Sequence, residues 1–133
     1  MGAEITIYRA GDDDVRYFGE DEADCEWYAS DTGCEIKAYR AGVDYVLTIE
    51  TFSDLAEAYA ADTDTDTDDA LATERAWRDQ HGSYLTDVWE DSLAVREWLG
   101  RRYDWVCFEE MHPNGQQGTT WYRCSDDDTV SAV

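Results

Sequence analysis

The amino-acid sequence predicts an α+β protein, on three observations. Residues 5–9 are rich in β-branched and aromatic side chains, which is typical of a strand. Residues 103–109 and 119–125 alternate apolar and polar side chains, and the turn sequence HPNG lies between them. Apolar residues recur at helical spacing over 70–80 and 84–99. Strands near both ends of the chain, with helices between them, favour the α+β class.

In the first third of the chain, the strand over 5–9 is expected to end at Gly11. A second short strand is expected over 26–30, after an acidic loop. A short helix then follows from residue 30 or 31 to residue 40, with Gly42 in the position of a left-handed C-cap. The tetrapeptide YRAG occurs at 8–11 and 39–42, so one copy would end a strand and the other a helix. The repeat is therefore interpreted as coincidental.

In the middle of the chain, residues 45–49 are apolar on both faces, which predicts a central strand. A helix is expected to begin at Ser53. The run DTDTDTDD over 62–69 is interpreted as an acidic low-complexity loop within the domain, because it lacks the central Gly and closing Glu of an EF-hand loop. Helices follow over 70–80 and 84–99, the second ending at Gly100.

The length of 133 residues predicts a single domain, 1–133, large enough to bury roughly two-thirds of its unfolded surface. The net charge of −22 comes from 32 acidic and 10 basic residues, of which only Lys37 is a lysine. Six Trp, nine Tyr and three Phe argue against intrinsic disorder. At molar salt, where the Debye length is about 3 Å, such a surface is hydrated with little self-repulsion. The composition therefore predicts a protein of a halophile or of its virus.

The charge also limits the partners. There is no basic stripe to neutralise phosphates, so nucleic acid and anionic membrane surfaces are not expected partners. The sequence contains no apolar stretch of membrane-spanning length and no signal peptide at its start, which predicts a cytoplasmic protein, with packaging in a virion as the alternative. A protein partner or a second copy of the chain stays open.

The four cysteines, at 25, 34, 107 and 124, contain no Cys-x-x-Cys pair. Three interpretations stay open: buried apolar residues, one or two disulfides, and a zinc site. The spacing favours the first, so no metal is expected.

Several short segments taken together resemble a known family. They are IYRA at 7–10, WYAS at 27–30, the following DTGCEIKAYRAG and VDYVLTIE, and near the end LGRRYDWV at 99–106 and TWYRCSD at 120–126. This order is similar to that of small ADP-ribosyltransferase-like domains of toxins and phages, and it covers most of the chain except the middle helices. The resemblance implies small split β-sheets, mixed or antiparallel, with flanking helices and an NAD-binding cleft between the sheets.

By that resemblance, Arg9 would contact a phosphate or ribose of NAD, and Ser30 would be the serine of the second motif. Tyr28 would form a wall for the nicotinamide. The family also uses a Glu that stabilises the positive charge on the ribose as nicotinamide leaves. At the start of the last long strand, where that Glu is expected, this chain has Gln117, which we assign to cofactor binding. Glu109, at the end of the preceding strand, is the candidate catalytic carboxylate, with Glu110 beside it.

Each of these residues also has a simpler interpretation. Arg9 could be a surface residue paired with an Asp, Ser30 an N-cap, and Glu109 a solvated charge at a strand end. Two hypotheses follow. The first is an ADP-ribosyltransferase-like protein that binds NAD, with or without catalysis. The second is a non-catalytic acidic protein that binds a partner or itself through aromatic surface such as Trp89 or Trp98.

Overall fold

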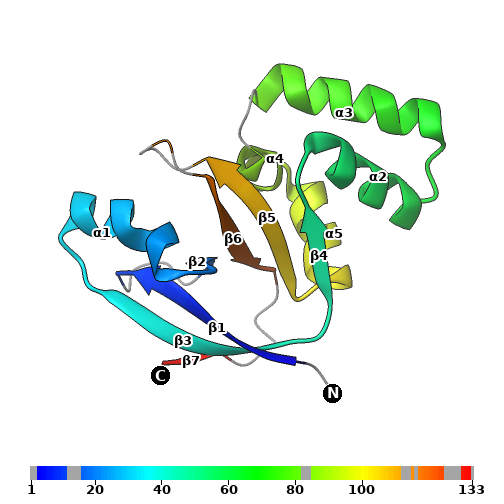
Figure 1. Cartoon of the computed structure of the whole chain (residues 1–133). Coiled ribbons are helices and arrows are strands. Elements are labelled where there is room, and N and C mark those ends of the chain that lie inside the picture. Colours follow the sequence, from blue (N-terminus) through cyan, green and yellow to red (C-terminus); the bar gives the residue numbers. More distant parts are fainter. Residues whose placement is uncertain are drawn as a thin grey trace. The chain divides into compact units, whose positions relative to one another are not determined.

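The computed structural model describes residues 3–11, 16–81, 85–111, 115, 117–124 and 130–132, and it has the α+β class that the sequence predicts (Figure 1). In chain order the elements are β1 (Ala3–Ala10), β2 (Tyr17–Gly19), the 3-10 turn η1 (Glu22–Cys25), α1 (Glu26–Thr32), β3 (Ile36–Val43), β4 (Val46–Ile49), α2 (Phe52–Asp62), α3 (Thr67–His81), α4 (Thr86–Asp91), α5 (Leu93–Arg102), β5 (Trp105–Met111), β6 (Gln117–Arg123) and β7 (Val130–Ala132).

The chain divides into two compact units. The first, residues 1–48 and 102–133, contains nearly all of the strands together with η1 and α1, and the second, residues 49–101, contains α2 to α4 and most of α5. We call them the sheet unit and the helical unit. In sequence the helical unit is an insertion between β4 and β5, which are neighbours in the sheet. The candidate site residues all lie in the sheet unit.

The strands form one seven-stranded sheet in the order β4-β5-β6-β2-β1-β3-β7 (Figure 1). The prediction of two split sheets is therefore wrong. The pairs β1–β2, β1–β3, β2–β6, β3–β7 and β5–β6 are all antiparallel. The strand over 45–49 was expected to be central, but β4 is at an edge of the sheet. Its Thr48 and the preceding Tyr45 are exposed, as suits an edge strand.

One face of the sheet carries the core of the sheet unit. Alternate residues of neighbouring strands form it: Ile7, Phe18, Ala41, Val43 and Trp105, with Ile5, Tyr39, Val46, Trp121 and Val130 packed around them. The Phe18 ring contacts the Trp105 ring edge-on, with 5.6 Å between centroids. The Trp105 and Trp121 rings are 6.3 Å apart in a similar arrangement. The aromatic content that argued against disorder is used here to bury apolar surface.

The predicted strand over 26–30 is wrong, because these residues lie in α1. Asp21 and Asp24 form a reciprocal capping box that begins η1, and η1 continues directly into α1. Gly33, with φ of 73°, supplies the left-handed C-cap that sequence reasoning assigned to Gly42. The strand preference of Trp27 and Tyr28 is thus overridden by a well-capped helix.

The predicted helix from residue 30 or 31 to residue 40 is also wrong, because residues 36–40 belong to β3. This strand pairs with β1 along its whole length, from Ala3 opposite Val43 to Ala10 opposite Ile36. The first YRAG therefore ends β1, with Gly11 just after the strand, and the second lies wholly within the adjacent β3, so Gly42 is not at a helix end. Eight consecutive pairs with a neighbouring strand outweigh the helical spacing of Ile36 and Tyr39.

In the helical unit the predicted helices are confirmed, with three corrections. Thr51 and not Ser53 is the N-cap of α2, where it forms a capping box with Asp54. The acidic loop is shorter than 62–69, because α2 includes Asp62 and α3 begins at Thr67. The helix over 84–99 is two helices, since Ser92 is extended and separates α4 from α5, which runs past Gly100. Within the described residues, the helices are too short or too polar to cross a membrane.

Candidate functional site

Arg9 is near the end of β1, half-buried, and its guanidinium is tied to the adjacent strand. Nη1 donates a hydrogen bond of 2.8 Å to the carbonyl oxygen of Tyr17. Nε is buried and has no acceptor within the described residues. Because Tyr8 pairs with Gly19 in an antiparallel register, Arg9 is opposite Phe18 of β2, and its charge acts on the Cys25 thiol at the end of η1. The simpler interpretation of Arg9, a surface side chain paired with an Asp, stays a prediction, because Asp12, Asp13 and Asp14 lie outside the described residues.

Tyr28 and Ser30 do not join Arg9 as the resemblance implies. Both are exposed residues of α1, and Tyr28 is 39% exposed. Ser30 is within the last turn of the helix, so it is not an N-cap either. The structure brings neither residue into the pocket described below. The physical reason is the change of element: residues 26–30 lie in a helix and not in a strand, and both side chains are exposed to solvent there.

Glu109 and Gln117, in contrast, meet in the β5–β6 hairpin. Glu109 is opposite Thr119, and Met111 is opposite Gln117, so the two side chains are diagonal neighbours on one face. The amide Nε2 of Gln117 donates to the carboxylate Oε2 of Glu109 at 3.2 Å. Both side chains are exposed. The hydrogen bond gives the Glu109 carboxylate a fixed partner without removing it from solvent.

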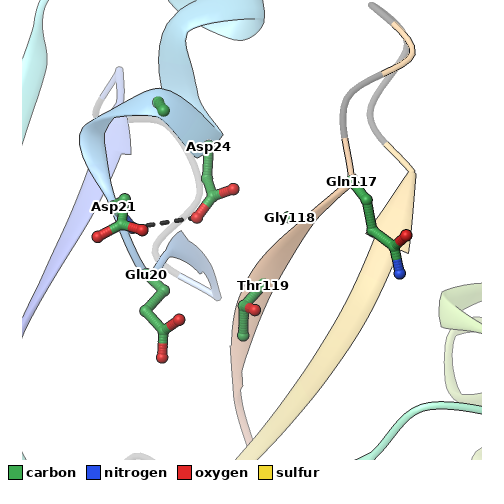
Figure 2. A pocket seen from close by; sticks show the side chains of 7 residues that line it. Glu20, Asp21, Asp24, Gln117, Gly118 and Thr119 are labelled. Atoms are coloured by element: carbon green, nitrogen blue, oxygen red, sulfur yellow. Dashed lines mark hydrogen bonds between the residues drawn. The ribbon is translucent and has the colours of Figure 1, made fainter.

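A pocket of about 450 Å³ opens beside this pair. Figure 2 shows its two walls: the end of β2 with η1 on one side, and the start of β6 on the other. The lining residues are Glu20, Asp21, Ala23, Asp24, Gln117, Gly118 and Thr119. The walls are joined where the Glu20 backbone N–H donates to the Thr119 carbonyl oxygen at 3.0 Å. Of the predicted site residues, Gln117 lines the pocket directly, and Glu109 is its hydrogen-bond partner.

The η1 wall is held close to β2 by a glycine. A Cβ at position 19 would lie 2.7 Å from the Asp24 Cβ and 2.9 Å from the Cys25 Sγ, which are distances that real Cβ atoms do not adopt. The backbone N–H of Asp21 donates to the Asp24 carboxylate at 3.0 Å, which fixes the first turn of η1 (Figure 2). Gly19 and the capping box therefore set the position of this wall.

Two thiols near the site have raised pKa values. Burial raises the pKa of Cys25, the nearby Asp24 raises it further, and Arg9 opposes this change. Burial likewise raises the pKa of Cys107 to about 11, with added contributions from Glu20 and Glu109. Cys107 is on the same strand as Glu109, two residues earlier. Both carboxylates therefore lie near one thiol.

All four cysteines are described as thiols, so the disulfide interpretation is wrong. Cys25 is buried, Cys107 and Cys124 are half-buried and Cys34 is exposed, so the apolar interpretation holds in full only for Cys25. Among the residues that the structure describes, no group of three or more His, Cys, Asp or Glu is arranged to hold a metal ion.

Sequence reasoning missed the acidic wall of the pocket. Glu20, Asp21 and Asp24 were assigned to an acidic loop before a strand. The signal that could have found the wall is the spacing of Asp21 and Asp24, three residues apart, as in a capping box. That spacing predicts a helical turn at this point and hence a rigid wall.

The arrangement presents a carboxylate held by an amide, a pocket with polar walls, and a half-buried guanidinium beside the same turn.

In comparisons with protein-family models, with curated proteins and with solved structures, the chain matches none.

Proposed function

We propose that this chain is an ADP-ribosyltransferase-like protein that binds NAD in the pocket between η1 and β6, with Glu109 as the carboxylate that faces the ribose. The observation that carries the proposal is the hydrogen bond from Gln117 to Glu109 at the pocket wall. Gln117 occupies the position at which the family resemblance expects a Glu. In this chain the amide orients a carboxylate from the neighbouring strand, and the charge that the glutamine lacks is available beside it.

The chemistry explains why a carboxylate is needed at this point. When the bond between nicotinamide and ribose breaks, positive charge develops on the ribose C1′ and ring oxygen. A fixed negative group stabilises that charge, and removing such a group typically costs about 10²–10³ in rate. The Gln117 amide can hydrogen-bond a ribose hydroxyl but cannot offset the charge. Glu109 can do so.

Arg9 supports the proposal as the group for the anionic part of NAD. A guanidinium suits a phosphate because of its planar set of donors. One donor of Arg9 is used by the Tyr17 carbonyl oxygen, and Nε has no acceptor within the described residues. Arg9 is opposite Phe18 of β2, two residues before Glu20 in the pocket wall, and is not itself among the residues that line the pocket. Ser30 and Tyr28, exposed on α1, are not part of this proposal.

The acidic wall bears on the conditions of binding. Glu20, Asp21 and Asp24 line the pocket and would repel the pyrophosphate at low salt. They favour the positively charged nicotinamide ring. At molar salt the Debye length of about 3 Å screens the repulsion. We therefore place NAD binding in the high-salt cytoplasm of a halophile, or in a virus of one, as the net charge of −22 suggests.

The test is calorimetric titration with millimolar NAD in molar KCl. Binding by the unaltered protein is expected. Arg9→Ala is expected to weaken it about tenfold or more, since charged hydrogen bonds contribute roughly 1.5–3 kcal/mol each. Glu4→Gln is the matched control, because Glu4 is an exposed carboxylate of β1 whose partner is Arg40. No heat and no saturation-transfer signal from NAD would overturn the proposal.

The second candidate function, association through aromatic surface, has less support. Trp89 and Trp98, its proposed contact residues, are buried. Among the described residues, the large apolar side chains that are exposed are Tyr28, Tyr45, Leu71 and Leu93. The mass of the unaltered protein in molar salt, compared with that of Tyr45→Ser and Leu93→Ser, tests this alternative.

A further inference from the structure

Three buried N–H groups of the sheet unit have no hydrogen-bond acceptor within the described residues. They are Nε of Arg9 and the indole Nε1 of Trp105 and of Trp121. Buried donors are nearly always paired in folded proteins, so these three call for a partner from outside the described chain. We propose that they bind a small monovalent anion, of which chloride is the one that molar KCl supplies. The inference goes beyond the proposed function, since none of the three residues lines the pocket between η1 and β6.

The three side chains lie on one face of the sheet, the face that carries the core of the sheet unit. Trp105 belongs to that core, and Trp121 packs against it. Arg9 is two residues after the core residue Ile7 on β1, and alternate residues of a strand share a face. Phe18 of β2 is opposite Arg9 on one side and opposite Trp121 on the other. The register therefore makes the three donors neighbours across β1, β2, β6 and β5.

The side chains also reach towards one another across these strands. Nη1 of Arg9 donates to the Tyr17 carbonyl oxygen at 2.8 Å, so the guanidinium has crossed from β1 to β2. The Trp105 ring is 5.6 Å from the Phe18 ring and 6.3 Å from the Trp121 ring, so it lies over β6 rather than over its own strand. Neighbouring strands are ~4.8 Å apart, so the guanidinium and the indoles are separated by about one strand spacing.

The chemistry of the three groups selects a ligand that accepts hydrogen bonds. An indole N–H and a guanidinium only donate, so a cation gains nothing from them. A water molecule accepts from two of them, but it must then place its own two hydrogens and leaves the charge of Arg9 without a counterion. An anion accepts from every direction, and its hydrogen bond to a charged donor is the stronger kind. Trp105 is fully buried, so its N–H cannot turn to bulk water instead.

Further positive charge flanks the donors. Lys37 of β3 is opposite Arg9, and Arg123 of β6 is opposite Trp105, so both lie on the same face. The chain has only 10 basic residues against 32 acidic ones. The face that carries the unpaired donors therefore has an unusual share of the positive charge of a strongly acidic protein.

Two carboxylates act against an anion on this face, and salt weakens their effect. The thiol of Cys107, which is opposite Trp121, has a pKa raised by burial and then by Glu20 and Glu109. Both carboxylates are exposed. At molar salt the Debye length of about 3 Å screens exposed charges, whereas buried groups are screened much less. We therefore expect the anion to bind at molar and not at millimolar chloride.

The first measurement follows the indole N–H resonances in ¹H–¹⁵N correlation spectra while chloride replaces gluconate at constant molar potassium. Saturable shifts are expected for Trp105 and Trp121, each assigned through its Phe variant. Trp98 is the internal control, because its Nε1 already donates to the Asp62 carboxylate at 2.9 Å. Shifts that do not saturate, or that are equal for Trp98 and the other two indoles, would overturn the proposal.

The second measurement repeats this titration with Arg9→Gln, and Arg40→Gln is the matched control. Arg40 is an exposed arginine of the neighbouring β3 whose partner is Glu4. A hydrogen bond from a charged donor contributes about tenfold or more to binding, so the half-saturating chloride concentration of Arg9→Gln is expected to rise by at least that factor. Arg40→Gln is expected to match the unaltered protein, and circular dichroism in the same salt checks both folds. An unchanged half-saturation in Arg9→Gln would overturn the role of the guanidinium and with it the anion site.

The third measurement locates the ion in crystals grown in molar KBr, since the anomalous scattering of bromide distinguishes it from water. One bromide is expected within hydrogen-bond distance of Arg9 Nε and of an indole nitrogen of Trp105 or Trp121. A water molecule or a carboxylate of the chain in that place would overturn the proposal. NAD is absent from all three measurements, so their outcome does not depend on the proposed function.

Discussion

Gly19 sits at the end of β2, where η1 passes closest to the sheet. Any side chain there must displace Asp24 and Cys25, whose atoms lie under 3.0 Å from the position of a Cβ. We predict that Gly19→Ala lowers the free energy of unfolding by about 1–3 kcal/mol, as overpacking does. Gly42→Ala is the control, because a Cβ at position 42 meets no atom within 4 Å. Urea denaturation in molar KCl measures both, and equal stability of the two variants would contradict the packing described at η1.

The raised pKa of Cys107 predicts how the stability of the protein changes at alkaline pH. Its pKa is raised from 9.0 to about 11 in the folded protein, so the folded state holds its proton more tightly than the unfolded state. The resulting stabilisation is fully present below pH 9.0 and is lost as pH rises through about 11. The unaltered protein should therefore lose stability between these values more steeply than Cys107→Ala. If the urea midpoints of the two proteins fall by the same amount across this pH range, the raised pKa is contradicted.

Residue patterns located part of the candidate site. Glu109 and Gln117 were expected to be site residues, and the hairpin brings them into contact because the alternation over 103–109 and 119–125 fixes which side chains share a face. Ser30 and Tyr28 do not lie with these two residues, because their element was misassigned. Glu20 could not be assigned to the pocket from sequence, since its position depends on the pairing of β2 with β6.

At the scale of elements, α1 and β3 show why local patterns failed. WYAS has strand preference and EIKAYR has helical spacing, and each segment adopts the other structure. The capping box at Asp21 and the C-cap at Gly33 define the helix, and pairing with β1 defines the strand. Long segments whose local pattern agrees with their packing, such as α3 and the β5–β6 hairpin, were predicted correctly.

The C-cap of α1 can be tested. Gly33 has φ of 73° and open space around it, so a side chain there meets conformational strain and no collision. We predict that Gly33→Ala lowers the free energy of unfolding by about 1 kcal/mol, whereas Gly33→Asn, which tolerates this backbone region, costs less. Thermal denaturation of both variants measures which of them is less stable. An Ala variant as stable as the original would mean that the helix does not end at Gly33.

For the whole molecule, the net charge of −22 predicts a requirement for salt. At low ionic strength the Debye length grows to about 30 Å, so carboxylates across the surface repel one another in the compact state. We predict that dialysis from molar to millimolar KCl removes much of the far-UV circular dichroism signal, and that restoring the salt restores it. A spectrum that does not change with salt would contradict the halophilic interpretation.

The class of the fold could be predicted from the sequence, but its topology could not. Three strands were missed: β2 and β7 have only three residues each, too few to show a period, and β3 was predicted as a helix. The single sheet with an inserted helical unit follows from the pairing of strands that are distant in sequence, for which local composition carries no signal.

The most direct test of the central claim is the place where NAD contacts the sheet unit. Backbone amide shifts in ¹H–¹⁵N correlation spectra, recorded in molar KCl during a titration with NAD, measure it. We predict that the largest shifts fall on the residues that line the pocket, from Glu20 to Asp24 and from Gln117 to Thr119, together with Glu109. Shifts confined to other strands or to the helical unit, or no shifts at millimolar NAD, would contradict it.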